Sequence, residues 1–127
     1  MKYLLDTSVW IEYFEGSQIG EKVSKMLKNK EDEFYTIPII ISEVISKIKR
    51  KRGDVESAFR IIKINSELLE IRADTAKEAG IIHAREKDKN DNFSLADAII
   101  IKIVQDNNIR LITKDNHFKK FKEAIII

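Results

Sequence analysis

The chain of 127 residues has no cysteine, two histidines, one proline and four glycines. The lack of cysteine excludes disulfides, thiolate nucleophiles and Cys-based zinc or iron–sulfur sites, and two histidines alone make a poor zinc site. No apolar run approaches the roughly 18 residues that a membrane span needs, and Asp6 interrupts the N-terminal segment before a signal-like run develops. We therefore expect a soluble, cytoplasmic protein that does not enter a membrane.

Basic residues are concentrated at two places, although the net charge is only +2. The first group is Lys47, Lys49, Arg50, Lys51 and Arg52, and the second is Lys114, Lys119, Lys120 and Lys122. Either group could receive phosphate groups. Each also fits a solvated helix end, because the helix dipole favours Lys and Arg in the last turn. Both interpretations stay open.

Short apolar segments alternate with stretches of helical periodicity. We expect strands at 2–6, 34–37, 68–71, 110–113 and 124–127. We expect helices at 9–14, 19–29, 38–52, 55–62, 74–85 and 95–104, and a short helical turn at 116–121. Because strands that alternate with helices form parallel sheets covered on both faces, the pattern predicts one α/β domain over residues 1–127. Its three α/β/α layers would surround a mainly parallel sheet of about five strands.

Capping signals mark two helix starts. Thr7 or Ser8 could cap the first helix. Ser94 and Asp97 have the spacing of a capping box that opens a strongly apolar helix. The charged and polar stretch 86–92 is typical of a solvated loop.

Acidic residues stand at the ends of the expected elements. Asp6 ends the first strand, Asp115 follows the fourth strand, Asp97 begins a helix, and Glu43 lies on the helix after the second strand. Ligands of parallel sheets bind beyond the carboxyl ends of the strands. Carboxylates gathered there would need divalent cations to balance their charge, which points to phosphodiester chemistry.

Each acid also has a purely structural interpretation. Asp6, Asp97 and Asp115 could cap the helix or turn that follows them, and Glu43 could form an ion pair with Lys47 one helical turn later. For a single acid these alternatives stay open. The joint pattern favours a shared site, because the predicted sheet brings these elements to one edge.

Four segments resemble the signature blocks of PIN-domain ribonucleases, in the same order and over most of the chain. They are Leu4–Ile11, Pro38–Val44, Leu95–Ile100 and Leu111–Phe118. Many family members have small residues after the third acid, whereas this chain has Ile99, Ile100, Ile101 and Lys102. That departure affects packing or dimerisation more than chemistry.

The resemblance implies a Mg²⁺- or Mn²⁺-dependent endoribonuclease that cuts single-stranded or loop regions of RNA. Its metal-binding and catalytic acids would be Asp6, Glu43, Asp97 and Asp115, supported by the hydroxyls of Ser8 and Thr113. If the chain is such an enzyme, the distribution of basic residues makes Lys47, Lys49, Arg50, Lys51, Arg52 and Lys114 its candidate RNA-binding residues. As a small single domain it is most similar to VapC-type toxins, which form homodimers and are silenced by an antitoxin protein.

Other interpretations stay open. A housekeeping PIN nuclease, or a PIN-fold RNA-binding or scaffold protein without catalysis, would have the same fold. A receiver domain fits poorly because Asp6 is followed by Thr7 rather than by an acid, and a haloacid-dehalogenase-type phosphatase would have an acid in place of Ser8. His117, beside Phe118 at a turn, is more typical of a partly buried histidine than of a substrate contact.

Overall fold

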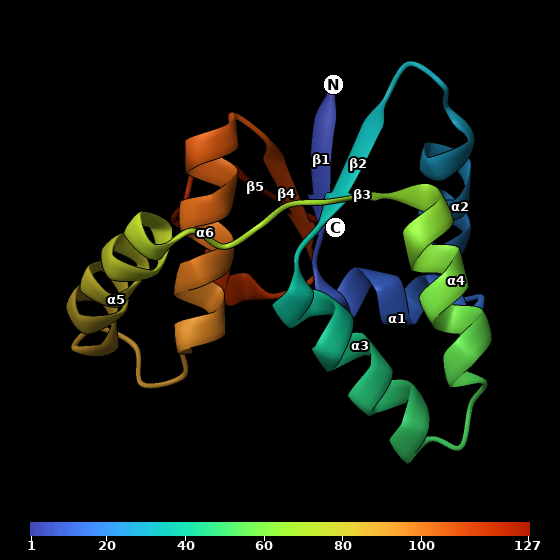
Figure 1. Ribbon diagram of the computed structural model, residues 1–127, viewed down its shortest axis with the longest axis horizontal. Helices are drawn as coiled ribbons and strands as arrows, with labels where there is room; N and C mark the ends of the chain where they lie inside the picture. Colours follow the sequence, from blue (N-terminus) through green and yellow to red (C-terminus); the bar gives the residue numbers. More distant parts are fainter.

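Five parallel strands form one sheet in the computed structural model, which describes residues 1–127, and their order is β3-β2-β1-β4-β5 (Figure 1). The strands are β1 (Lys2–Leu5), β2 (Glu33–Thr36), β3 (Glu67–Leu68), β4 (Arg110–Thr113) and β5 (Ala124–Ile126). The helices are α1 (Thr7–Glu15), α2 (Gln18–Lys28), α3 (Pro38–Arg50), α4 (Val55–Asn65), α5 (Ala73–Lys87) and α6 (Leu95–Asn107), with a 3₁₀ turn η1 (Asn116–Phe118).

Helices cover both faces of this sheet. Helices α1 to α4 lie on one side of the sheet and α5 and α6 on the other (Figure 1). The chain moves from β1 to β2 to β3 on one side and then returns across the sheet to β4, so right-handed crossovers place the two groups of helices on opposite faces. The predicted three-layer α/β/α fold with a five-stranded parallel sheet is confirmed. No helix is both long and apolar enough to cross a bilayer.

The core lies between the central strands and the two helical layers. Leu4 and Leu5 of β1 and Leu111 of β4 are completely buried, as expected for central strands covered on both faces. Trp10 from α1 and Phe93 before α6 are completely buried in the same core. This packing fixes the ends of β1 and β4, from which two of the candidate acids emerge.

The N-cap of α1 differs from the prediction. Asp6, in extended conformation, caps the helix, and its side chain accepts a hydrogen bond from the Thr7 N–H. Thr7 and Ser8 therefore lie in the first helical turn and do not cap it. Because neither hydroxyl caps the helix, the Thr7 hydroxyl contacts the carboxylate of Glu43 and the Ser8 hydroxyl that of Asp6.

The region around β3 and α5 also differs from the prediction. Strand β3 ends at Leu68, and 69–72 cross over to α5 instead of continuing the strand to residue 71 (Figure 1). One more hydrogen bond, from Leu69 N–H to the Thr36 carbonyl, marks where pairing stops. Helix α5 runs on to Lys87, and Glu86, expected in a solvated loop, is buried.

Gly20 permits a close approach of α2 to α1. A Cβ atom at this position would lie 2.1 Å from the backbone carbonyl oxygen of Glu12. Gly80, in the middle of α5, has no such neighbour, and a Cβ there would meet open space. The first glycine is thus required by helix packing and the second is not.

Candidate functional site

Two polar residues meet where β1 and β4 end. Leu5 pairs with Ile112 in the parallel ladder, and the Asp6 N–H donates to the Ile112 carbonyl at 2.9 Å. The next residues, Asp6 and Thr113, therefore face each other across the strand ends. Their side chains are both buried, at 7% and 0% exposure.

Asp6 is held by hydrogen bonds to both of its oxygens. Its Oδ1 accepts from the Thr7 N–H at 2.8 Å, and its Oδ2 accepts from the Thr113 hydroxyl at 2.6 Å. The Ser8 hydroxyl lies 3.5 Å from the same Oδ2. The predicted supporting roles of Ser8 and Thr113 correspond to these contacts.

The Asp6 carboxyl is difficult to ionise despite these hydrogen bonds. Its pKa is raised from 3.8 to about 6, chiefly by burial and also by the neighbouring carboxylates of Asp97 and Glu43, while the donors Thr113 and Thr7 act in the opposite direction. Desolvation and like charges both disfavour the anion. The site thus holds negative charge that its own hydrogen bonds do not fully stabilise.

Glu43 joins this group through Thr7, which the sequence analysis considered only as a helix cap. Its Oε1 accepts a hydrogen bond from the Thr7 hydroxyl at 2.9 Å, although the two residues are 36 positions apart. Thr7 is itself buried. Glu43 is therefore oriented from α1 and not by the alternative ion pair with Lys47. A hydroxyl directly after a candidate acid was the only available sequence signal for Thr7.

Asp97 has the predicted capping role and also a place in the acidic group. The Ser94 side chain accepts from the Asp97 N–H at 3.0 Å, and Asp97 Oδ2 accepts from the Ser94 N–H at 2.9 Å, which completes the capping box at the start of α6. Burial chiefly raises the pKa of Asp97, with a further contribution from Asp115; Ser94 and His117 oppose it. The cap alone does not offset this unfavourable environment.

Asp115 lies near Asp97 and contacts His117. Its Oδ1 accepts from the His117 N–H at 2.9 Å, so it caps η1, as the structural alternative predicted. The imidazole Nδ1 of His117 is 3.1 Å from Asp115 Oδ1 and 3.9 Å from Asp97 Oδ2. The Asp115 N–H also donates to the Thr113 hydroxyl at 2.9 Å, and Thr113 in turn donates to Asp6. Hydrogen bonds through Thr113 thus link the two ends of the acidic group.

The four acids therefore share one environment while three of them also cap a helix or turn. No Lys or Arg forms an ion pair with any of the four, and His117 is the one basic side chain beside them. No three of these side chains form a ready-made cage around a cation. Their chemistry nevertheless suits Mg²⁺ or Mn²⁺, because carboxylate oxygens are hard ligands and a divalent cation would stabilise the anions of Asp6 and Asp97, whose pKa values are raised.

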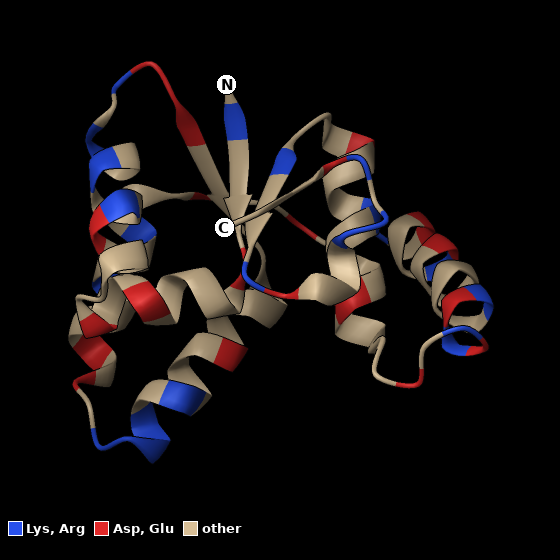
Figure 2. Ribbon diagram, turned by 180° about the vertical axis from the view of Figure 1, so that it is seen from behind, with Lys and Arg blue, Asp and Glu red and all other residues tan.

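The basic residues of the first group lie at the exposed C-terminal end of α3 and just after it. Lys51 pairs with Glu15 of α1, whereas Lys47, Lys49, Arg50 and Arg52 have no ion-pair partner. Figure 2 shows Lys and Arg on this end of α3 and also in the segment after η1, with acidic segments near the strand ends between them. Basic residues therefore lie on both sides of the acidic group.

Lys114 behaves differently from the α3 group. It directly precedes Asp115, and its ammonium pairs with Glu12 of α1. Its N–H donates to the Ser8 hydroxyl at 3.2 Å. Both contacts fix the loop after β4 against α1, so Lys114 has a positioning role, and its role in RNA binding stays a prediction.

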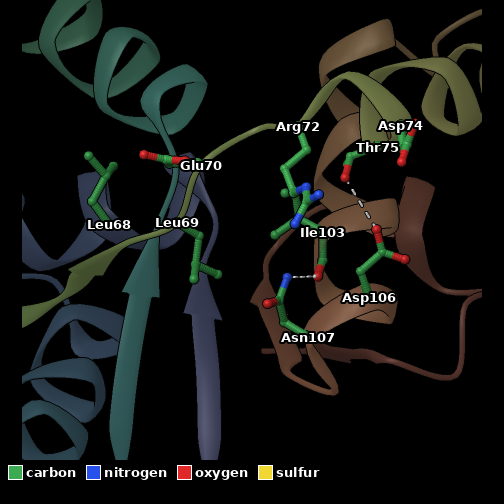
Figure 3. A pocket seen from close by; sticks show the side chains of 9 residues that line it. All are labelled: Leu68, Leu69, Glu70, Arg72, Asp74, Thr75, Ile103, Asp106 and Asn107. Carbon is green, nitrogen blue, oxygen red and sulfur yellow. Dashed lines mark hydrogen bonds between the residues drawn. The ribbon is translucent and has the colours of Figure 1, made fainter.

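A separate hollow of about 500 Å³ lies between the 69–72 crossover and the C-terminal part of α6 (Figure 3). Arg72 points into it, and the Thr75 hydroxyl donates to Asp106 at 3.3 Å on its far wall. Asp106 is nine residues beyond Asp97 on α6, which is about 13 Å along a helix. This hollow is therefore not part of the acidic site.

Comparisons with known proteins agree with this fold. A family model of the PIN domain matches residues 3–124. A search of curated proteins found no match. A toxin–antitoxin complex from Klebsiella pneumoniae contains a similar chain, with 22% identity and a TM-score of 0.76, covering 97% of this chain and 95% of that chain.

Two further solved structures are similar. VapBC2 from Rickettsia felis, bound to a DNA fragment from its promoter, has 17% identity and a TM-score of 0.75, covering 100% of this chain and 98% of that chain. VapC20 from Mycobacterium tuberculosis, a toxin that cleaves the sarcin-ricin loop, has 18% identity and a TM-score of 0.74, with 92% of each chain covered. At these identities the likeness shows a shared fold.

Proposed function

This chain belongs to the PIN domain family, and we propose that it is a Mg²⁺- or Mn²⁺-dependent endoribonuclease that cuts single-stranded or loop regions of RNA. One observation supports the proposal above the others. Four carboxylates from β1, α3, α6 and the loop after β4 share one environment without a Lys or Arg counter-charge, and the pKa of Asp6 is raised to about 6. Such an arrangement is unfavourable for stability alone and is typical of a functional site.

The proposed cation would be held by Asp6, Glu43, Asp97 and Asp115. A bound divalent cation supplies an activated water molecule and neutralises charge that develops on the scissile phosphate. Thr113 orients the Asp6 carboxylate and Thr7 orients Glu43, so both acids are fixed by neutral donors that leave their negative charge uncompensated. Hydrogen bonds from residues that do not themselves bind the metal set the orientation and basicity of the residues that do.

We further propose that the protein acts in the cytoplasm as a toxin that an antitoxin controls. The similar solved chains from Klebsiella pneumoniae and Rickettsia felis come from toxin–antitoxin complexes. By that analogy the protein would form a homodimer and bind an antitoxin that blocks the acidic site. A housekeeping nuclease of the same family is the alternative, and a gene for a small DNA-binding partner beside this one would favour the toxin.

The test is cleavage of total cellular RNA by purified protein in Mg²⁺, in Mn²⁺ and in EDTA, with the Asp6→Asn variant and single-stranded DNA as comparisons. We expect RNA fragments in either metal, none in EDTA, and none from the variant at matched fold content. Intact RNA in every metal, from a folded and partner-free sample, would instead favour a PIN-fold RNA-binding or scaffold protein. Equal cleavage by Asp6→Asn would refute the assignment of the site.

A further inference from the structure

A hollow of about 400 Å³ opens directly beside the acidic site. Its lining residues come from the loop after α5 and from the segment around η1, and they are Asn90, Asn116, His117, Lys119 and Lys120. None of them is hydrophobic. Sites for small organic ligands have similar volumes, about 300–1,000 Å³, but are mostly apolar. This hollow therefore suits a polar, negatively charged ligand that extends from the acids.

Three side chains offer donors to such a ligand. Asn90 uses its Oδ1 to accept from the Asn92 N–H at 3.0 Å, which fixes the side chain and leaves its NH₂ group available. Asn116 is exposed and makes no side-chain hydrogen bond within the protein. Lys119 is exposed and forms no ion pair, unlike Lys114 and Lys51. Its charge is thus free to meet a phosphate.

Lys120 is fixed in the wall of the hollow by a buried acid. Its ammonium pairs with Glu86, which is only 4% exposed and lies at the end of α5. A buried carboxylate is strongly unfavourable unless it is paired, so this contact ties the segment after η1 to α5. Arg85 Nε lies 3.4 Å from the other oxygen of Glu86. The two cations around one acid leave the wall with net positive charge.

His117 connects the hollow with the acids. Its Nδ1 faces Asp115 and Asp97, at 3.1 and 3.9 Å, while the residue also lines the hollow. The imidazole thus stands between a group of anions and a group of donors. A nucleic-acid strand could place one phosphate of its backbone at the acids and the next phosphate beyond His117.

We propose that this hollow is a subsite for the nucleotide next to the scissile phosphate, with Lys119 binding its phosphate and the amides of Asn90 and Asn116 contacting its sugar or base. Single-stranded RNA is the ligand class, because a duplex would not direct one isolated nucleotide into a hollow of this size. The inference rests on the proposed function, since that function places an RNA strand across the acids.

The experiment measures binding separately from cleavage. Fluorescence anisotropy follows a short, labelled, single-stranded RNA with 2′-O-methyl riboses, which resists cutting, on the full chain and on Lys119→Ala, Asn116→Ala and the double variant. Lys122→Ala is the matched control, because Lys122 is an exposed lysine of the same segment that does not line the hollow. Circular dichroism confirms that each variant is folded.

We expect Lys119→Ala to weaken binding about tenfold, as one lost charge-assisted hydrogen bond implies, and the double variant to weaken it further. Lys122→Ala should change the affinity less than about twofold, within the usual range for a rim charge. Equal effects of Lys119→Ala and Lys122→Ala, or no binding by any protein, would overturn the subsite. Cleavage of total RNA is scored in parallel. Active enzyme with unchanged Lys119→Ala affinity would refute the subsite alone, whereas Lys119-dependent binding without cleavage by the unaltered chain would refute the nuclease and keep the binding site.

Discussion

Replacing Asp6 with Asn should stabilise the folded protein at neutral pH in the absence of metal. The folded-state pKa of Asp6 is about 6, against an ordinary value of 3.8, chiefly because the carboxyl is buried. Ionisation is therefore less favourable in the folded chain than in the unfolded one. A difference of about two pKa units corresponds to about 3 kcal/mol. Asparagine keeps the shape and an oxygen acceptor for the Thr7 N–H but has no charge to desolvate.

The sign of the pH dependence follows from proton binding. Between pH 3.8 and about 6 the folded state retains the Asp6 proton while the unfolded state loses it. The free energy of unfolding of the unaltered chain should therefore fall as pH rises through this window and then level off. The Asp6→Asn variant lacks this contribution. The two proteins should converge near pH 4 and differ by up to about 3 kcal/mol at pH 8.

Urea unfolding in EDTA, followed by circular dichroism from pH 4 to pH 8, measures this difference. Asp97 also has a raised pKa, but it is present in both proteins, so its own burial largely cancels and their difference reports the charge of Asp6 together with its repulsion by neighbouring acids. Asp88→Asn is the control, because Asp88 is exposed at the end of α5. This variant should have nearly the same free energy of unfolding as the unaltered chain at every pH. A variant that is no more stable than the unaltered chain at pH 8, or a gap that does not close towards pH 4, would refute the reasoning.

Further predictions concern packing, the support of the acids, and RNA affinity. Gly20→Ala should destabilise the fold strongly, because its Cβ would overlap the Glu12 carbonyl, whereas Gly80→Ala should stabilise it by up to about 1 kcal/mol; thermal unfolding compares the two. Thr7→Val should lower the affinity for Mn²⁺ about tenfold while Thr7→Ser retains it, and a metal titration with equal affinities would assign Thr7 to packing. Replacing Lys49 and Arg50 with Ala should reduce the salt slope of RNA binding by about 1.4, from two lost phosphate contacts. An unchanged slope would assign this part of α3 to a solvated helix end.

The arrangement of the sheet was predictable because its signals are local and repeated. Apolar strands such as 110–113 alternate with helices, and right-handed crossovers then determine which faces the helices cover. The capping box at Ser94 and Asp97 is likewise a short-range pattern and was confirmed. Strand β3 was predicted too long, because the apolar residues Leu69 and Ile71 belong to the crossover and pack against the core from there instead of extending the strand.

The details of the site depend on contacts that sequence spacing does not contain. The hydroxyl of Thr7 reaches Glu43 only because α1 packs against α3, so its role could not be separated from helix capping beforehand. Glu86 lies in a charged stretch typical of a loop, yet it is buried because Lys120, 34 positions later, returns to pair with it. Both features arise from tertiary packing that overrides local polarity.

Asp97 offers the most direct test of the central claim, because its capping role and its proposed metal role make different predictions. Rates of Mn²⁺-dependent cleavage of one RNA fragment are compared for the unaltered chain, Asp97→Asn and Ser94→Ala. Asparagine can still accept the hydrogen bond from the Ser94 N–H, whereas Ser94→Ala loses half of the capping box and about 1 kcal/mol of stability. The account predicts that Asp97→Asn abolishes cleavage in a stable protein and that Ser94→Ala keeps it. Cleavage that survives in Asp97→Asn would contradict the account and leave Asp97 as a helix cap.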